Sequence, residues 1–178
     1  MSDVRFYLLW MTTFLGFPVG GTLAILLVGS IEGVVSGAVA GVLAGSIVGA
    51  AQWLVLRGRP GVGVAWIPAT AFGLGVGDAV GAALTGAGTG IESLVVTGVA
   101  SGAAVGLLQW ALLRRHVRGA GLWPAVMAIS WPLGWTVTWA VGVDVERGYA
   151  IFGATGALVF AAITGAAMLL ALRDGRCR

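Results

Sequence analysis

The sequence predicts an all-α integral membrane protein in which six transmembrane helices form three repeated hairpins with Gly-rich close packing. Three observations lead to this fold class: a very apolar composition, six apolar stretches of membrane-spanning length, and an internal repeat. Of the 178 residues, 58% are hydrophobic and only 10% are charged, whereas a soluble domain carries about 25% charged residues. The mean hydropathy is +0.99. Because the chain lacks the polar surface of a water-soluble fold, we expect lipid to surround it.

One segment repeats with a shift of 57 residues. Residues 33–57 read GVVSGAVAGVLAGSIVGAAQWLVLR, and residues 90–114 read GIESLVVTGVASGAAVGLLQWALLR. Both copies end in Gln-Trp-x-x-Leu-Arg, which a bias toward small apolar residues does not explain. A weaker third copy ends at Leu172-Arg173, with Met168-Leu169 in place of Gln-Trp. Internal repeats define an architecture, so we predict one membrane domain, 1–178, made of units at about 1–57, 58–116 and 117–178.

Six apolar stretches are long enough to cross a bilayer, which takes about 20 helical residues at a rise of about 1.5 Å each. The first stretch follows Arg5 as a signal peptide would. Its length, and its place as the first helix of the first unit, indicate that it is retained. The predicted spans are 6–28, 33–56, 62–84, 91–113, 122–143 and 148–172.

The arginines predict the orientation of these spans. All 10 basic residues are arginines, and only Arg147 falls on the side opposite to the others. The positive-inside rule makes the arginine-rich side cytoplasmic, together with both termini. Arginine without lysine, in a chain rich in Gly, Ala and Val, indicates a GC-rich bacterial genome, so we expect the inner (plasma) membrane of a bacterium. The cytoplasmic arginines are Arg5, Arg57, Arg59, Arg114, Arg115, Arg118, Arg173, Arg176 and Arg178, whereas Glu32, Asp144 and Glu146 accompany Arg147 in the outer turns.

Glycine recurs at every fourth position through the second span, starting from Gly29, and the fourth span keeps part of the pattern. Apolar contact drives no association in lipid, so small residues favour helix pairing by letting backbones approach closely. The stripes predict a tight inner bundle within one monomer. Alternatively, part of one stripe forms an oligomer interface. The packing residues predicted are Gly33, Gly37, Gly41, Gly45, Gly49, Gly98, Gly102 and Gly106.

The odd-numbered spans contain prolines. Pro124 falls in the first helical turn, where its missing N–H is harmless. Pro18 and Pro132 lie within their spans and should free the carbonyls near Phe14 and Ala128. Interrupted helices at matching positions of repeats point to transporter binding sites, but they also occur as plain kinks.

Asp78 is the acid that lies deepest within a span, about 15 residues into the third one. A charged side chain at the bilayer centre costs roughly 2.5–3.5 kcal/mol on insertion scales. One hypothesis is a cation or proton site facing a polar cavity, with help from Thr70, Thr85 or Glu92. The other is a structural acid near the outer interface, protonated or hydrogen-bonded, and held by a Ser or Thr of another helix.

Each Gln-Trp-x-x-Leu-Arg end places an amide, an indole and a guanidinium near the inner boundary. Trp and Arg at headgroup depth are typical interfacial anchors, and Trp and Arg four residues apart can stack as a cation–π pair. The amides are expected to bond across helices. A role in docking anionic lipid or a cytoplasmic partner is the alternative. The anchor residues predicted are Gln52, Trp53, Arg57, Gln109, Trp110 and Arg114.

A tryptophan stripe, Trp131, Trp135 and Trp139, follows the fifth span. Bulky residues at this spacing pack against glycine grooves or face lipid. The alternative is a platform for an apolar or aromatic ligand, such as a lipid tail or a quinone.

Several functions are excluded by what the sequence lacks. His116 and Cys177 are the only residues of their types, so we expect no intramolecular disulfide, metal site, haem or other cofactor. No catalytic motif or paired intramembrane carboxylate is found, and an enzyme is not expected. The arginines cluster between spans, which indicates membrane topology rather than nucleic-acid binding.

These observations favour a non-catalytic membrane protein whose partners are membrane lipids and either a second copy of itself or another membrane protein. The expected role is a compact subunit or scaffold. The alternative is a small-solute or ion transporter that uses Asp78 and the kinked odd-numbered helices.

Overall fold

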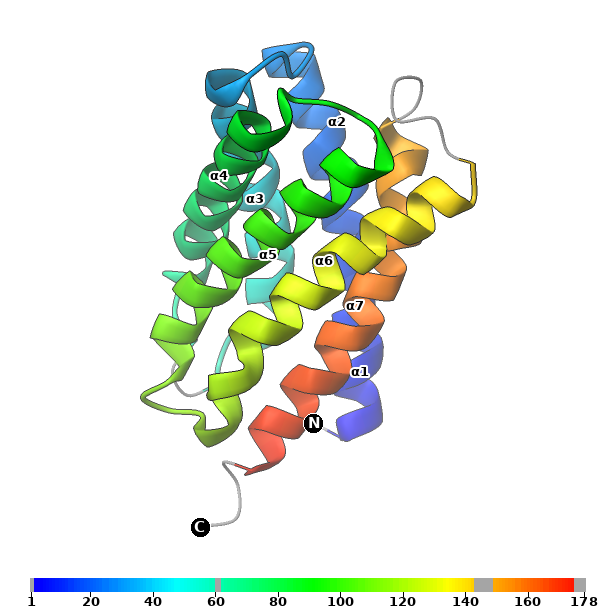
Figure 1. The fold of residues 1–178 in the computed structure, drawn as a ribbon. Coiled ribbons are helices and arrows are strands. Elements are labelled where there is room, and N and C mark those ends of the chain that lie inside the picture. Colours follow the sequence, from blue (N-terminus) through cyan, green and yellow to red (C-terminus); the bar gives the residue numbers. More distant parts are fainter. Residues whose placement is uncertain (1, 60–61, 143–148, 175–178) are drawn as a thin grey trace.

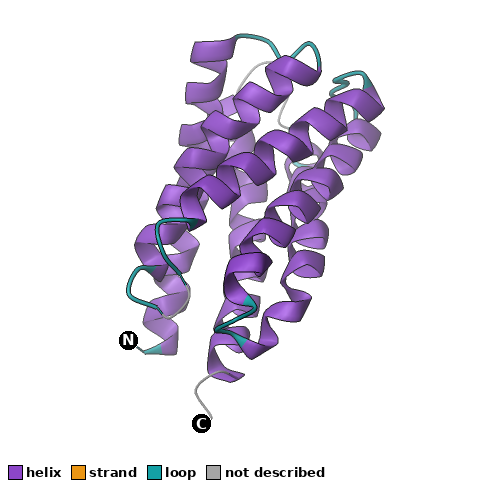
Figure 2. Ribbon diagram, turned by 90° about the vertical axis from the view of Figure 1, so that its left-hand side faces the viewer, coloured by secondary structure: helices purple, strands orange, loops and turns teal. Residues whose placement is uncertain are grey.

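The structure, a computed structural model, describes residues 2–59, 62–142 and 149–174. Every regular element in these ranges is a helix, and none is a strand (Figure 2). The helices run side by side along one long axis as a bundle of six helical rods (Figure 1). The predicted all-α fold class is confirmed.

The first rod consists of α1 (Asp3–Met11), a short 3-10 segment (Thr12–Leu15) and α2 (Gly16–Val28). Pro18 cannot donate a hydrogen bond to the carbonyl four residues earlier, at Phe14, and Phe14 lies within the 3-10 segment. The interruption predicted for this span is therefore present. Because the chain stays helical on both sides of it, the rod can still span a membrane as one unit.

The next helices end close to their predicted limits. These are α3 (Val34–Leu56), α4 (Trp66–Thr85) and α5 (Ile91–Leu113). Between α2 and α3, Gly29 caps the C-terminus of α2 with φ of +82°, a conformation that glycine adopts most readily. The predicted glycine stripe therefore does not begin at Gly29, which lies outside α3.

The last third of the chain contains a 3-10 turn (Arg118–Leu122), α6 (Trp123–Ala140) and α7 (Tyr149–Asp174). Pro124 lies in the first turn of α6, as predicted. Pro132 lies inside α6, which continues through it as one helix. Because Pro132 has no N–H, it cannot donate to the Ala128 carbonyl four residues earlier, as predicted, but α6 is not interrupted there.

Five of the rods are long and apolar enough to cross a membrane. The sixth rod, α6, was predicted to be a span and is helical, but it does not belong to this group. Its four tryptophans and two prolines lower its mean hydropathy below that of these five. The five are Asp3–Val28, Val34–Leu56, Trp66–Thr85, Ile91–Leu113 and Ala154–Arg173.

The start of α1 and the end of α7 lie at the same end of the bundle (Figure 1). Arg173 Nη2 lies 2.6 Å from Asp3 Oδ2. The guanidinium of Arg59, after α3, lies 4.9 Å from the centre of the Phe6 ring in α1. We call this end the terminal end. The predicted outer-turn residues Asp144, Glu146 and Arg147, and the C-terminal Arg176, Cys177 and Arg178, lie outside the described residues.

Candidate functional site

Glycines of α3 face the backbone of α4. A Cβ atom added at Gly41 would lie 2.7 Å from the Leu74 carbonyl oxygen and 2.8 Å from the Gly75 Cα. At Gly45 it would lie 2.8 Å from the Ala71 Cα. Since these distances are shorter than a Cβ contact allows, only glycine fits at either position with the helices this close.

Glycines of α5 face α6 in the same way. A Cβ at Gly98 would lie 2.9 Å from the Pro132 Cα, and one at Gly102 would lie 2.9 Å from the Ala128 Cα. A shift of 57 residues relates these pairs to the α3–α4 pairs, because it takes Gly41 and Gly75 to Gly98 and Pro132. The same shift takes Gly45 and Ala71 to Gly102 and Ala128. The same shift also relates a third pair of contacts, that of Gly49 with Ile67 and that of Gly106 with Pro124.

The remaining glycines of the α3 stripe differ in their surroundings. Gly37 also faces α4, where its Cβ position lies 3.3 Å from the Asp78 carbonyl oxygen. Gly33 is the N-cap of α3, and nothing lies within 4 Å of its Cβ position. Within the helix, contact with α4 therefore extends from Gly37 to Gly49.

A chain of hydrogen bonds links the two glutamines of the repeated motif inside the bundle. The side chains of Gln52 and Gln109 are 1% and 0% exposed. Gln109 Nε2 donates to Gln52 Oε1 at 3.1 Å and to Thr70 Oγ1 at 2.9 Å. Thr70 in turn donates to the Trp66 carbonyl at 2.9 Å. The amides thus join α3, α4 and α5 in the core. The predicted bonding across helices is confirmed, although the two glutamines were grouped with the interfacial anchors.

Each glutamine also accepts a hydrogen bond from a buried tryptophan 14 residues later. Trp66 Nε1 donates to Gln52 Oε1 at 3.0 Å, and Trp123 Nε1 donates to Gln109 Oε1 at 2.8 Å. These two tryptophans were not among the predicted site residues. They too are 57 residues apart, so applying the repeat shift to every Trp would have found them.

A third buried tryptophan, Trp10 of α1, completes a cluster. Its ring centre lies 6.4 Å from that of Trp123, which lies 6.4 Å from that of Trp66. Trp10 Nε1 donates to Thr164 Oγ1 of α7 at 3.1 Å. Met168, one turn beyond Thr164, is also fully buried. Thr164 therefore accepts an indole hydrogen bond, as Gln52 and Gln109 do from Trp66 and Trp123.

The Trp and Arg residues of the motif lie closer to the surface than its glutamines. Trp53 and Trp110 are partly buried. The guanidinium of Arg114 lies 5.1 Å from the centre of the Trp110 ring, which is a cation–π geometry. Arg57 is the C-cap of α3. The motif thus has a buried amide followed by an indole and a guanidinium at the end of its helix.

Asp78 projects from α4 and is partly buried. Its Oδ1 accepts a hydrogen bond from Ser101 Oγ of α5 at 2.6 Å. Gly77 faces the backbone of Ser101, so the absence of a side chain brings α4 and α5 close enough for this bond. Ser101 was missing from the predicted site, although the hypothesis of a structural acid included a Ser or Thr on another helix.

The other residues predicted around Asp78 lie apart from it. Thr70 is two turns away and belongs to the glutamine network. Thr85 Oγ1 donates to the Gly81 carbonyl in its own helix at 2.8 Å. Glu92 is exposed in the first turn of α5. Helical position, not separation in sequence, decides which of these polar groups meet.

A cavity of about 130 Å³ lies beside Asp78, and we call it the Asp78 cavity. It is lined by residues of α2, α3, α4 and α6, and by Ile31 from the loop between α2 and α3. Asp78 is the only acid among its lining residues, and the rest of the wall is apolar side chains and one glycine. The lining residues are Phe17, Gly21, Ala24, Ile25, Ile31, Ala40, Ala44, Val48, Leu74, Asp78, Trp131 and Trp135.

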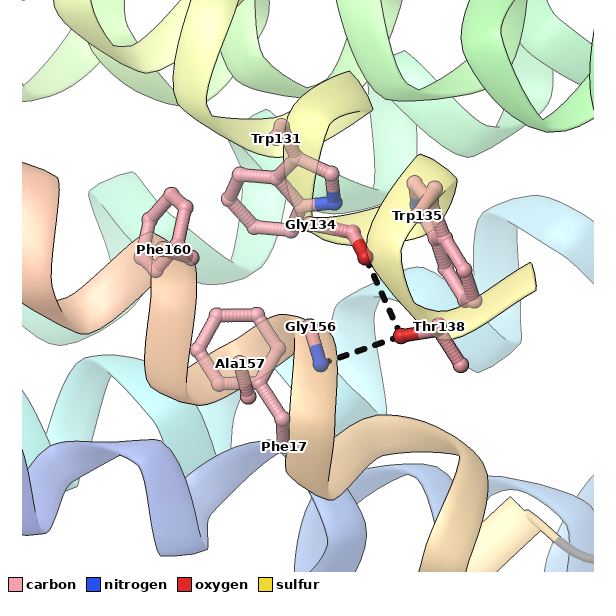
Figure 3. Close-up of a pocket in the computed structure, with 8 residues that line it drawn as sticks. All are labelled: Phe17, Trp131, Gly134, Trp135, Thr138, Gly156, Ala157 and Phe160. Atoms are coloured by element: carbon pink, nitrogen blue, oxygen red, sulfur yellow. Dashed lines mark hydrogen bonds between the residues drawn. The ribbon is translucent and has the colours of Figure 1, made fainter. Parts of the chain in front are cut away.

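A smaller cavity of about 40 Å³ shares the aromatic wall of the Asp78 cavity and lies between α2, α6 and α7 (Figure 3). Phe17, Trp131 and Trp135 line both cavities. Thr138 Oγ1 accepts a hydrogen bond from the Gly156 amide at 3.0 Å and donates to the Gly134 carbonyl at 3.0 Å (Figure 3). Two residues of the predicted tryptophan stripe therefore line cavities, whereas the third, Trp139, is half exposed.

The described residues contain no group of three or more His, Cys, Asp or Glu side chains that could hold a metal ion. No family model, curated protein or solved structure matches the chain. The functional assignment therefore rests on the chain's own side chains. Asp78 is an ionisable residue that lines a cavity.

Proposed function

We propose that this protein is a non-catalytic, multi-pass membrane protein that binds a small solute or ion beside Asp78 and transports it. One observation carries the proposal: the acid deepest in a predicted span lines a cavity within the bundle. Acids within membrane spans are costly to insert and generally face the interior of a bundle or a water-filled path. A carboxylate held by Ser101 on one side and adjoining a cavity on the other suits binding of a positively charged solute.

Replacing Asp78 with asparagine is expected to abolish flux of the transported cation through proteoliposomes. Asparagine keeps the shape of the side chain and an oxygen for the Ser101 hydrogen bond, but it removes the charge. The measurement is uptake of protons, sodium and methylammonium by vesicles containing the purified protein. Undiminished flux in the Asp78→Asn variant would remove Asp78 from the mechanism.

The second candidate is a compact subunit or scaffold that packs against itself or another membrane protein. The interlocked glycine contacts between α3 and α4, and between α5 and α6, favour it, because helices this close cannot slide past one another easily. These contacts already occupy the glycine stripes within one chain, so a partner protein would bind other surfaces. The flux experiment separates the two candidates: no flux of any cation, together with a co-purifying membrane protein, would favour the subunit.

We also propose that the three hairpins are related and that the terminal end faces the cytoplasm of a bacterial cell. The pairs of contacting residues that recur 57 positions apart support the relationship. The arginines at the terminal end support the orientation.

Cysteines placed at Arg59 and Arg115, in separate variants lacking Cys177, are expected to react with a membrane-impermeant maleimide only after the cells are opened. A cysteine at Glu92 should react in intact spheroplasts. Labelling of positions 59 and 115 from opposite faces would contradict both the orientation and the repeat of hairpins.

A further inference from the structure

We infer that the Asp78 cavity binds a small organic ammonium cation whose apolar body is about the size of benzene. The inference rests on the proposed solute-binding role and names the class of solute. It combines three features of one cavity: a carboxylate, an apolar wall and aromatic rings.

The charge of the ligand follows from Asp78, the only acid among the described residues that line the cavity. Ser101 donates one hydrogen bond to Oδ1, but a hydroxyl does not neutralise a carboxylate. An unpaired charge in an apolar environment is costly. A cation in the cavity would supply a counter-charge for the ionised carboxylate.

The wall of the cavity favours an organic cation over a metal ion. Calcium takes six to eight oxygen ligands and magnesium six, often with several waters. Among the described lining residues, Asp78 is the only one whose side chain carries an oxygen. An ammonium group attached to hydrocarbon needs fewer oxygen ligands, because its C–H surface makes contact with Leu74, Val48 and the other apolar residues.

Aromatic rings provide a second attraction for such a cation. Phe17 of α2 and Trp131 of α6 pack edge to face, with ring centres 5.5 Å apart. Trp135 lies one turn beyond Trp131 and also lines the cavity. Ring faces attract ammonium groups by about 0.5–2 kcal/mol, most strongly at desolvated sites, and tryptophan is the best such ring.

The volume of the cavity limits the size of the ligand. At about 130 Å³ it is close to the volume of roughly 150 Å³ in which an apolar protein cavity holds benzene. Ile25 and Ile31 line it near the end opposite the terminal end. The cluster of Trp10, Trp66 and Trp123 fills the core toward the terminal end. The ligand would therefore enter from the end opposite the termini.

Benzylammonium is the probe for this site, and benzyl alcohol is its neutral counterpart. Calorimetric titration of the full chain in mild detergent should show saturable binding of benzylammonium, with benzyl alcohol binding at least tenfold more weakly. The Asp78→Asn variant should lose at least tenfold in benzylammonium affinity. Gly21→Leu should abolish binding, because Gly21 lines the cavity and nothing lies within 4 Å of its Cβ position.

Glu32→Gln is the control for charge, since it removes one negative charge from the exposed loop after α2 and should leave the affinity unchanged. Equal binding of the two probes, equal affinity in the Asp78→Asn variant, or no binding at millimolar concentration would overturn the inference. Binding without flux would contradict transport but leave the ligand class standing. Flux of sodium or protons without benzylammonium binding would support transport but contradict the proposed ligand class.

Discussion

Leucine at both Gly41 and Gly45 is expected to prevent the bundle from forming. The first carbon of each new side chain would fall 2.7–2.8 Å from backbone atoms of Leu74, Gly75 and Ala71. Overpacking in a protein core typically costs about 1–3 kcal/mol per site when side chains can adjust. Backbone atoms cannot rotate away, so α3 and α4 would have to separate along two turns. We expect aggregated protein, with no monodisperse peak in size-exclusion chromatography in mild detergent.

Gly21→Leu is the matched control, because it adds the same side chain inside helix α2, where the Cβ position is open. It should give a monodisperse protein with a melting temperature near that of the wild type. A milder variant, Gly45→Ala, should remain folded but melt at a lower temperature. A Gly41→Leu, Gly45→Leu protein with wild-type yield and melting temperature would show that the α3–α4 contact does not hold the fold together.

The limits of the helices were largely predictable, because membrane-spanning length and apolar composition constrain them together. The limits of α5 match the predicted span 91–113, and α3 starts one residue after the predicted position 33. Whether a proline also interrupts its helix was less predictable. Pro18 follows the 3-10 segment Thr12–Leu15, whereas α6 continues through Pro132. Proline removes one hydrogen bond in either case, and the surrounding packing decides whether the helix breaks.

The candidate site was predictable only in part, since sequence does not show which helices are neighbours. Asp78 stood out because an acid is rare within a span, but its partner Ser101 lies on another helix. Thr70 looked close to Asp78 in sequence and instead bonds to Gln109. The apolar wall of the Asp78 cavity had no sequence signal, because the same residue types also face lipid.

If the three hairpins are related, as we propose, the third one keeps the geometry of the other two while its residues change. The glutamine position of the first two units is occupied by Met168, and Thr164 accepts the indole hydrogen bond one turn earlier. Methionine is flexible and fills the space of a glutamine side chain without its polar atoms. The third hairpin therefore supplies a hydrogen-bond acceptor for Trp10, although its sequence resembles the other two only weakly.

The substitution Gln109→Met is expected to lower the unfolding free energy by about 2 kcal/mol. Gln109 makes three side-chain hydrogen bonds, to Gln52, Thr70 and Trp123. Hydrogen bonds between membrane helices average about 0.6 kcal/mol, with a maximum near 1.7 kcal/mol. Methionine has a similar shape, so the loss should come from hydrogen bonding rather than from a cavity. Unfolding in mixed micelles of increasing denaturing detergent measures the change.

A double-mutant cycle with Trp123→Phe tests the physical reason for this loss. In the Gln109→Met protein, Trp123 Nε1 loses its acceptor, whereas Trp66 still donates to Gln52 and Thr70 still donates to the Trp66 carbonyl. Removing the orphaned indole N–H should therefore cost less in the Gln109→Met background than in the wild type. If the two substitutions are additive, the Trp123–Gln109 hydrogen bond contributes nothing to stability, and Trp123 acts only through the packing of its ring.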